Sequence, residues 1–225
     1  MTGIIDINEL LEMAGAPVPE PARSRDMPLK PILRYAVFRD DHIGRWREIL
    51  THAWRPGPKL CWISYSADKS TAELSNLTIK RITGWSYRAG YAGLTVVSLY
   101  PVVMWDHVQV QAWRTSDPDT FNLMMQAATN AGQASRDATD IVVATGPLNP
   151  AEVSDFESWI GLFRDARGRR KTRWLCIGTT EYGWPLPPAG RGRTPPPAEV
   201  RLRPWTMPTV HAPRETDQPA NSEVF

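Results

Sequence analysis

Cysteine is scarce in this chain, which has only Cys61 and Cys176 among its 225 residues. Two cysteines do not build the disulfide framework of a small secreted domain, and neither belongs to a Cys-x-x-Cys pair. Each lies inside an apolar segment that we expect to form a buried strand. There a thiol packs as a small apolar group, so we expect neither cysteine to be a reactive thiolate.

Long apolar runs are also missing. No run approaches the roughly 20 residues that a helix needs to cross a bilayer. The first 15 residues contain Asp6, Glu9 and Glu12 but no basic segment, which is unlike a signal peptide. We therefore expect a soluble cytoplasmic protein, in the host cytoplasm if a phage encodes it, with no membrane partner.

The motifs of several enzyme classes are absent. No spacing of His, Cys and carboxylate residues is typical of a metal site. "GPLNP" at residues 146–150 lacks the glycines and the lysine of a phosphate-binding loop. The four histidines fall in four different segments and do not suggest a Ser-His-Asp triad: His42, His52, His107 and His211. We expect neither a metal ion nor a cofactor.

Proline is abundant but unevenly distributed. The 21 prolines lie mainly before residue 32 and after residue 184, whereas ten tryptophans and an apolar content of 42% exclude disorder of the whole chain. We predict an N-terminal helix, capped by Asp6, and a proline-rich linker over residues 1–31. An α/β core domain follows over residues 32–188, and then a Pro/Arg-rich tail, partly extended or disordered, over residues 189–225.

Four apolar segments of the core do not alternate with polar residues and are separated by helical patterns. The expected strands are residues 59–65, 93–103, 139–147 and 172–180, and the expected helices are residues 76–88, 117–135 and 149–166. Asn76, Asp117 and Asn149 are the expected caps of these helices. Buried strands that alternate with helices predict an α/β three-layer sandwich with a mostly parallel central sheet.

Two earlier segments need a separate interpretation. Residues 32–38 alternate between apolar and polar side chains and indicate a strand. Residues 45–54 fit one face of a helix as well as one face of a strand. We favour a hairpin of two strands.

Ligands of open parallel sheets bind beyond the carboxyl ends of the strands, so the loops after the four core strands should share one rim. The expected ligand-binding residues in these loops are Ser64, Ser66, Ser98, Thr145, Thr180 and Tyr182. The candidate catalytic residues, as general acids or bases, are Asp68, Asp106 and His107. Alternatively, the charged groups belong to exposed loops, the serines satisfy backbone groups, and Tyr182 covers the core.

Positive charge is concentrated near the end of the chain, although the formal net charge is only +2. Residues 164–203 contain ten basic side chains against three acidic ones, and such an excess can contact phosphates. The expected contacts to a nucleic-acid backbone are Arg167, Arg169, Arg170, Lys171 and Arg173. Alternatively, these residues form only a solvated helix end, where cations interact favourably with the helix dipole.

The order of motifs resembles a family of small bacterial and phage proteins, the domain-of-unknown-function family 1643. Its members show L-N-P-S-T-A-D, D-D-P-T-I-R-R, G-Y-G-G-L-x-V-V-N-L-F, a strand ending A-W-G, and C-L-G-x-T-x-x-G-x-P-x-H-P-L. The corresponding segments here, within residues 33–205, are "ISYSADKS", "SNLTIKR", "GYAGLTVVSLY", "VVATG" and "CIGTTEYGWPLPP". The shared residues include Ser66, Thr78, Ile79, Arg81, Gly146, Cys176, Gly178, Thr180, Gly183, Pro185 and Pro188.

Several polar residues of that family are replaced in this chain. The Asn-Pro of the first motif is Ser64-Tyr65, the acidic pair of the second is Ser75-Asn76, and the asparagine of the third is Ser98. Thr145 stands in place of a tryptophan and Pro187 in place of a histidine. If those groups carry the activity of the family, this chain binds its ligand without catalysing a reaction.

The layout of the loops is also similar, at the level of fold, to the uracil-DNA glycosylase superfamily. In those proteins, loops after the first and last strands grip a flipped base. The resemblance implies a divergent glycosylase-like protein that recognises a nucleobase, nucleotide or nucleic acid in phage or mobile-element DNA metabolism or modification. The alternative is a catalytically silent module of a phage or bacterial assembly, whose arm and tail bind a protein partner.

Overall fold

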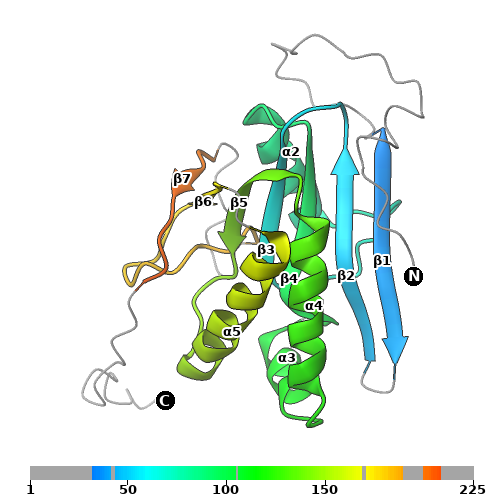
Figure 1. Cartoon of the computed structure of the whole chain (residues 1–225), viewed down its shortest axis with the longest axis vertical. Coiled ribbons are helices and arrows are strands. Elements are labelled where there is room, and N and C mark those ends of the chain that lie inside the picture. Colours follow the sequence, from blue (N-terminus) through cyan, green and yellow to red (C-terminus); the bar gives the residue numbers. More distant parts are fainter. Residues whose placement is uncertain (1–31, 42–43, 105, 169–170, 190–199, 209–225) are drawn as a thin grey trace, which may run out of the picture.

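The computed structural model describes residues 32–41, 44–104, 106–168, 171–189 and 200–208. The helix predicted near the N-terminus and most of the predicted tail lie outside these residues. The described part of the chain forms one sheet of seven strands with four helices packed against it (Figure 1). It is therefore an α/β structure, as the sequence predicts.

The sheet is mixed, with the strand order β1-β2-β4-β3-β5-β6-β7. The strands are β1 (Leu33–Asp41), β2 (Gly44–Ala53), β3 (Lys59–Ala67), β4 (Gly93–Val103), β5 (Ala138–Ala144), β6 (Arg173–Cys176) and β7 (Arg203–Pro204). β4, β3, β5 and β6 are parallel to one another, whereas β1, β2 and β7 add three antiparallel pairings. The expectation of a mostly parallel sheet is not confirmed.

The antiparallel edge of the sheet is the hairpin that we favoured for the first two segments. Gly44 adopts a φ of 128° at the turn, a conformation that is open to glycine. β2 is buried along most of its length because it lies between β1 and β4. Burial on both faces removes the polar alternation of a strand, which explains why residues 45–54 also fit a helix.

β7 joins the sheet from the segment that we predicted to be the tail. Its two residues pair with the end of β6. The next residue, Trp205, is buried, and its backbone N–H donates a hydrogen bond of 2.8 Å to the carbonyl oxygen of Trp174. The core therefore includes residues beyond the predicted boundary at 188, because Trp205 anchors the returning chain.

The helices are α2 (Leu77–Arg88), α3 (His107–Arg114), α4 (Thr120–Ala134) and α5 (Pro150–Arg167). The predicted caps of α2 and α5 are confirmed. Asn76 accepts a hydrogen bond from the backbone N–H of Ile79, and Asn149 forms a capping box with Glu152. In a capping box both side chains bond to backbone N–H groups that the helix leaves unpaired.

The start of α4 differs from the prediction, and α3 was not expected. Asp119, rather than Asp117, occupies the cap position of α4. Asp117 instead accepts a hydrogen bond of 2.8 Å from the backbone N–H of Asp119. This local bond forms a turn ahead of the helix, so the predicted boundary was too early.

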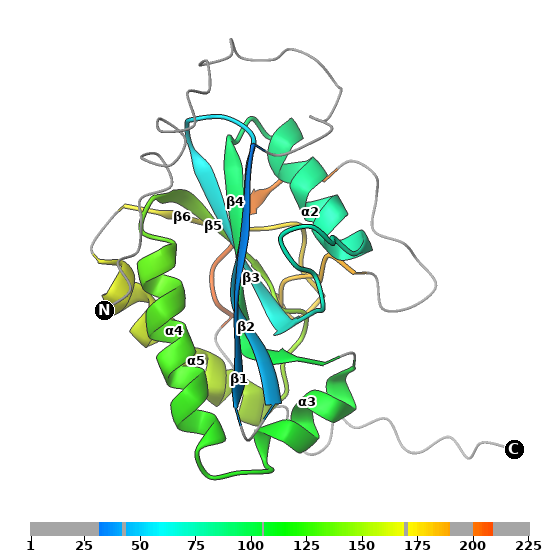
Figure 2. The ribbon, with the colours of Figure 1, turned by 90° about the vertical axis from the view of Figure 1, so that its right-hand side faces the viewer.

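Helices cover both faces of the sheet (Figure 2). Trp62 of β3 packs against Ile79 and Ile82 of α2 on one face, whereas Cys61 and Ile63 pack on the other face with side chains of α4 and α5. This division follows from the two-residue repeat of a strand. Among the described helices, only α2 packs on this face, so the regular three-layer sandwich that we expected is not confirmed.

The carboxyl ends of β3, β4 and β5 lie at the same end of the sheet, near α3 in the lower part of Figure 1. The register places Ser64 beside Ser98 of β4 and Ala144 of β5. A Cβ atom on Gly146 would lie 3.7 Å from Pro187, so the loops after β5 and β6 are also in contact. We call this end of the sheet the rim.

Candidate functional site

A small pocket opens at the rim between α2 and the sheet. Its volume is about 40 Å³, and the residues around it come from β2, β3, β4, β5, α2 and the loop after β6. The apolar wall is formed by Trp62, Ile79, Ile82, Val96, Ala144 and Pro188. The polar side chains are Arg47, Ser64, Ser66, Asp68 and Thr78. We call this site the rim pocket.

Arg47 and Asp68 form an ion pair in the rim pocket. Nη1 of Arg47 donates a hydrogen bond of 2.6 Å to Oδ1 of Asp68 and one of 3.2 Å to its carbonyl oxygen. The same nitrogen lies 3.3 Å from the carbonyl oxygen of Ser70, and the backbone N–H of Ser70 donates to Oδ1 of Asp68 at 2.7 Å. The bonds from Arg47 hold the loop after β3 against β2.

Two opposing effects act on the pKa of Asp68. Burial favours the neutral carboxyl, but attraction to Arg47 and hydrogen bonds from Ser70 outweigh burial and lower the pKa below its usual value. Burial lowers the pKa of the Arg47 guanidinium, and Asp68 opposes that change. Arginine stays protonated in proteins, so this pair supplies one charge of each sign and no net charge.

Arg47 has an unused donor. Its side chain is only 1% exposed, and within the described residues its buried Nε has no hydrogen-bond partner. A buried donor without an acceptor costs about 1–3 kcal/mol. Arg47 is therefore a charged lining residue of the rim pocket whose hydrogen bonds are incomplete within the described residues.

The predicted serines belong to the strands and not to the loops after them, since Ser64 and Ser66 lie in β3 and Ser98 lies in β4. Ser64 and Ser98 are joined by a hydrogen bond of 2.9 Å between their hydroxyl oxygens, and the hydroxyl of Ser64 also donates to the carbonyl oxygen of Val97 at 3.1 Å. Ser98 is buried behind Ser64 and does not line the pocket. Ser66 and Thr78 do line it, so three hydroxyl groups face the pocket, counting Ser64.

Three other predicted ligand-binding residues do not line the pocket. Thr145 is buried at the end of β5. Thr180 shapes the loop after β6, because its hydroxyl oxygen accepts a hydrogen bond of 3.2 Å from the backbone N–H of Trp184. Tyr182 is 76% exposed at the tip of this loop. The same loop reaches the rim pocket only through Pro188.

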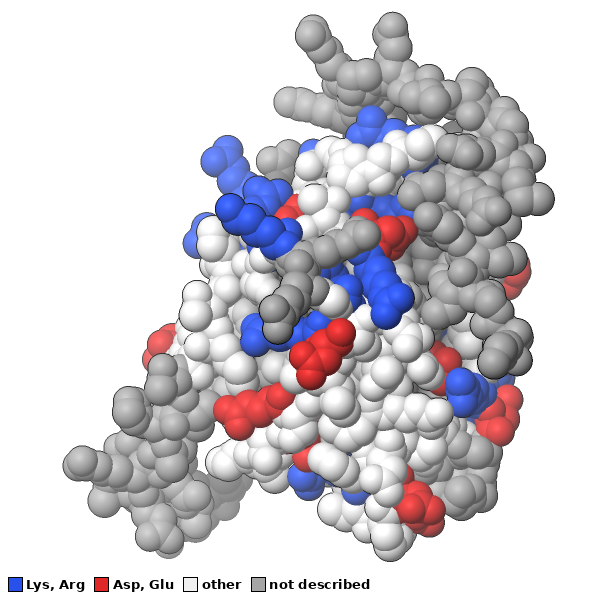
Figure 3. Space-filling model, viewed as in Figure 1, with Lys and Arg blue, Asp and Glu red and all other residues white. Residues whose placement is uncertain are grey.

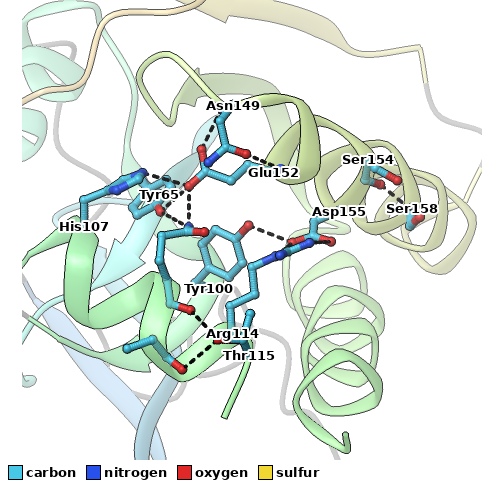
Figure 4. Close-up of polar contacts among 12 residues, drawn as sticks. Tyr65, Tyr100, His107, Arg114, Thr115, Asn149, Glu152, Ser154, Asp155 and Ser158 are labelled. Atoms are coloured by element: carbon cyan, nitrogen blue, oxygen red, sulfur yellow. Dashed lines mark hydrogen bonds and ion pairs between the residues drawn. The ribbon is translucent and has the colours of Figure 1, made fainter. Parts of the chain in front are cut away.

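His107 belongs to a second polar cluster, drawn in Figure 4. Its Nε2 lies 2.8 Å from Oε1 of Glu152, a carboxylate that is almost fully buried. The hydroxyl of Tyr65 donates to the same oxygen at 2.6 Å, and the side-chain amide of Gln111 donates to it at 2.5 Å. The rings of His107 and Tyr65 are stacked with their centroids 5.1 Å apart.

Asp106 and His107, two of the candidate catalytic residues, have different partners although they are adjacent in the chain. Asp106 is the cap of α3, and its Oδ1 accepts a hydrogen bond of 2.8 Å from the backbone N–H of Gln109. The acidic partner of His107 is Glu152, from the start of α5. Because Tyr65 packs on the face of α5 and Ser64 on that of α2, this cluster and the rim pocket lie on opposite faces of the sheet.

A neighbouring group in Figure 4 joins the same elements. The hydroxyl of Tyr100 donates to Oδ2 of Asp155 at 2.8 Å, and Arg114 donates to both oxygens of this carboxylate. Burial and the hydrogen bond to Asp155 raise the pKa of Tyr100. These contacts tie α3, α5 and β4 together and indicate a structural role.

Arg167, Lys171 and Arg173, three of the predicted nucleic-acid contacts, lie at or near the end of α5 and the start of β6, at the opposite end of the sheet. Lys and Arg side chains gather in the upper half of Figure 3. Arg167 is buried and donates to the carbonyl oxygens of Ser135 and Ala138, so its guanidinium is committed within the protein. Arg173 forms a bidentate pair with Asp140, at 2.8 and 2.7 Å. Lys171 is exposed, and Arg169 and Arg170 lie outside the described residues.

The cysteines are buried, and burial raises the pKa of Cys61 to about 12 and that of Cys176 in the same direction. Among the described residues, no group of three or more His, Cys, Asp or Glu side chains is placed to hold a metal ion. In the same part of the chain, no helix has the length and apolar character to span a membrane.

Comparison with known proteins identifies a family for this chain. The model of the family described as "Protein of unknown function (DUF1643)" matches residues 47–188. The chain belongs to this family. No curated protein and no solved structure matches the chain. The fold similarity to uracil-DNA glycosylases therefore stays a prediction.

The match to DUF1643 and the rim pocket cover the same part of the chain. Arg47 and Pro188, the first and last matched residues, both line the pocket. Ser66 and Thr78, which this chain shares with the motifs of the family, line it as well. Ile79 and Pro188 are also shared with those motifs and line the pocket, whereas other shared residues such as Thr180 and Gly183 do not.

The residues of these clusters that the sequence did not single out include Arg47 and Glu152. Arg47 stands in the segment with ambiguous periodicity, where no pattern distinguishes a buried arginine from an exposed one. Glu152 has the signature of a capping box, Asn-Pro-x-Glu, and that role accounts for its presence without a second one.

Proposed function

We propose that this DUF1643 protein recognises a nucleobase, free or within a nucleic acid, at the rim pocket. The observation that carries the proposal is the buried Nε of Arg47, which lacks a partner among the described residues although Arg47 lines the pocket. A buried charged group without its full set of hydrogen bonds is unusual, and binding sites are a common reason for one.

The chemistry of the pocket matches the edge of a base. Such an edge presents hydrogen-bond donors beside acceptors, and the pocket offers the guanidinium of Arg47, the carboxylate of Asp68 and three hydroxyl groups. Because the ion pair has no net charge, the pocket suits a neutral polar group better than a phosphate. Apolar side chains such as Trp62 suit the faces of an aromatic ring.

The size of the pocket limits how a base would bind. About 40 Å³ holds only a few water molecules, so one polar edge of the base would enter and the ring would lie in the mouth. Ser64, Ser66 and Asp68 keep the ligand-binding role that the sequence suggested for this loop, and Arg47 and Thr78 are added to it.

The environment of Asp68 favours a role in ligand binding over a role as the general base of a hydrolysis reaction. A general base works best when its pKa lies near the working pH, and the pKa of Asp68 is lowered instead. We therefore assign Asp68 to positioning Arg47 and accepting a hydrogen bond from the ligand. Glycosylase chemistry and a role in phage or mobile-element DNA metabolism stay predictions.

Isothermal titration calorimetry with the five common nucleobases and their nucleosides tests the proposal. We expect binding to at least one of them, and a loss of affinity of about fivefold to tenfold for Ser66→Ala, which removes one hydrogen bond. Ser158→Ala on α5 is the matched control, since the hydroxyl of Ser158 bonds only to the carbonyl oxygen of Ser154. Absence of binding by the wild-type protein, or equal effects of the two substitutions, would contradict the proposal.

The alternative function, binding to a protein partner, is favoured by a different observation. Large apolar side chains are exposed in the segments that follow β3, β4 and β6: Leu74, Leu77, Val108, Tyr182 and Leu186. Exposed apolar groups that gather in one region are typical of protein interfaces. A chain that binds no nucleobase, nucleoside or nucleic acid at low salt would leave this alternative as the better account.

A further inference from the structure

A larger cavity lies at the opposite end of the sheet from the rim pocket. Its volume is about 360 Å³, and it lies between the last turn of α5 and the start of β6. The side chains that define it are Arg164, Asp165, Arg167, Thr172 and Trp174. This volume lies within the range of pockets that bind small organic ligands, about 300–1,000 Å³. We call the cavity the basic cleft.

One wall of the basic cleft is an aromatic ring covered by a cation. The guanidinium carbon of Arg164 lies 4.7 Å from the centre of the Trp174 ring. Phe163 packs edge-on against Trp174 with ring centroids 6.3 Å apart, which fixes the orientation of the indole. Arg164 is exposed and Trp174 is half-buried. Bases of nucleic acids stack on such rings and on arginine planes.

The floor of the basic cleft is held in place by Arg167. Its guanidinium donates to the carbonyl oxygens of Ser135 and Ala138 and to the hydroxyl of Thr172. These bonds join α4, β5 and the segment before β6 to the end of α5. Arg167 therefore shapes the cleft and adds positive charge to it, although its donors are already used.

The surroundings of the basic cleft are predominantly positive. Lys171 is exposed beside it, and the exposed Arg136 donates a hydrogen bond of 2.9 Å from Nε to the carbonyl oxygen of Ala166. Asp165 is the acidic residue of the lining, and the nearby Asp140 is neutralised by Arg173. A polyanion is attracted to such a surface, and its affinity falls as salt is added.

We propose that the basic cleft binds single-stranded nucleic acid, with one base stacked at the Arg164–Trp174 wall and the adjacent phosphates near Arg164 and Lys171. A single strand is required because a base in a duplex is already stacked and cannot lie against the indole. This inference goes beyond the rim pocket and does not depend on it. The two sites lie at opposite ends of the sheet, so a strand that contacts both must be long.

Fluorescence anisotropy with a labelled 20-nucleotide oligothymidine, measured over a series of salt concentrations, tests the inference. We expect Arg164→Ala to raise the Kd by about fivefold to tenfold. Loss of one phosphate contact should also reduce the slope of log Kd against log salt by about 0.7. Trp174→Leu should raise the Kd by a similar factor, with a thermal melt to show that this variant is folded.

Arg45→Ala is the matched control, because Arg45 is also exposed and its guanidinium carbon lies 4.6 Å from the centre of the Phe38 ring. Arg45 is far from the basic cleft in the fold, at the hairpin turn of β1 and β2, and its removal should leave the Kd unchanged. Binding by Arg164→Ala equal to that of the wild type would overturn the inference. So would an equal loss in Arg45→Ala, or equally tight binding of a 20-base-pair duplex.

The outcomes for the two sites can be separated. Nucleoside binding at the rim pocket should respond to Ser66→Ala and not to Arg164→Ala. Oligonucleotide binding at the basic cleft should respond to Arg164→Ala and not to Ser66→Ala. The oligonucleotide is used at concentrations below those at which nucleosides bind. A failure of one site therefore leaves a clear result for the other.

Discussion

Arg47 and Asp68 meet in an ion pair of 2.6 Å, although one comes from β2 and the other from the loop after β3. Their environments differ, since the Arg47 side chain is 1% exposed and that of Asp68 is 25% exposed. A charge that loses its partner costs more when water cannot reach it. The two residues should therefore respond unequally to substitution.

The first prediction uses this inequality. Asp68→Asn leaves the buried guanidinium of Arg47 without a counter-charge and should lower the free energy of unfolding by about 3 kcal/mol. Arg47→Met fills the same space with an apolar side chain and leaves a carboxylate that water can reach, so its effect should be smaller. Urea denaturation of both variants measures the difference. An equal or larger loss for Arg47→Met would contradict the geometry.

The second prediction concerns acid and His52 of β2. Within the described residues both ring nitrogens of His52 are buried and without partners. Burial, followed by repulsion from Arg34 and Arg47, lowers the pKa of His52 to about 4. Above pH 6.5 the imidazole is neutral in both states and has no effect. Between pH 6.5 and 4 only the unfolded chain takes up the proton, so stability falls as pH falls.

The size of this effect follows from the difference between the two pKa values. At 1.36 kcal/mol for each pH unit, His52 should lower the free energy of unfolding by about 3 kcal/mol on going from pH 7 to pH 4. His52→Leu should lose this part of the pH dependence. Asp68 titrates below this window, because its pKa is lowered from 3.8. Parallel stability curves for His52→Leu and the wild type would show that His52 does not carry the effect.

The third prediction concerns Glu152, which joins three elements. Its Oε1 accepts hydrogen bonds from Tyr65, Gln111 and His107, and its Oε2 accepts one of 2.8 Å from the backbone N–H of Asn149. Glu152→Ala removes the acceptor of the buried Tyr65 hydroxyl, breaks the capping box and should lower the free energy of unfolding by about 2–4 kcal/mol. Glu157→Ala, at an exposed position of the same helix, should change it by less than about 0.5 kcal/mol. Thermal melts that fail to separate these two variants would count against the network.

The fourth prediction compares two glycines in helices. A Cβ on Gly132 of α4 would lie 2.4 Å from the carbonyl oxygen of Phe163 in α5, whereas a Cβ on Gly161 of α5 would have no atom within 4 Å. Alanine favours a helix over glycine by about 1 kcal/mol. Gly161→Ala should therefore stabilise the protein, and Gly132→Ala should destabilise it despite the same gain in propensity. Chemical denaturation gives both values, and stabilisation by Gly132→Ala would show that α4 and α5 are not packed this closely.

Some elements of this fold could be predicted from local sequence patterns, whereas others depend on contacts between distant segments. β3 and the caps Asn76 and Asn149 are specified by local patterns, and these predictions are confirmed. The antiparallel pairing of β2 could not be predicted from its own residues, because it depends on which strand lies beside it. The two residues of β7 carry no strand pattern, and they pair with β6 directly before the buried Trp205.

The same limit applies to the candidate sites. The serines of the rim could be located because the carboxyl ends of parallel strands share an edge, and Ser64 and Ser98 are indeed in contact. Pairing of charges could not be predicted, since the partner of Asp68 is 21 residues away and that of His107 is Glu152 rather than the adjacent Asp106. Side-chain pairs of this kind are set by the packing of the whole sheet.

The measurement that tests the central claim most directly is an NMR titration of the arginine Nε–Hε signals with a saturating nucleobase or nucleoside. If the rim pocket takes the edge of a base, the signal of Arg47 shifts on binding and the signal of the exposed Arg45 does not. Binding of one ligand per chain with no change in the chemical shift of the Arg47 signal would contradict the account.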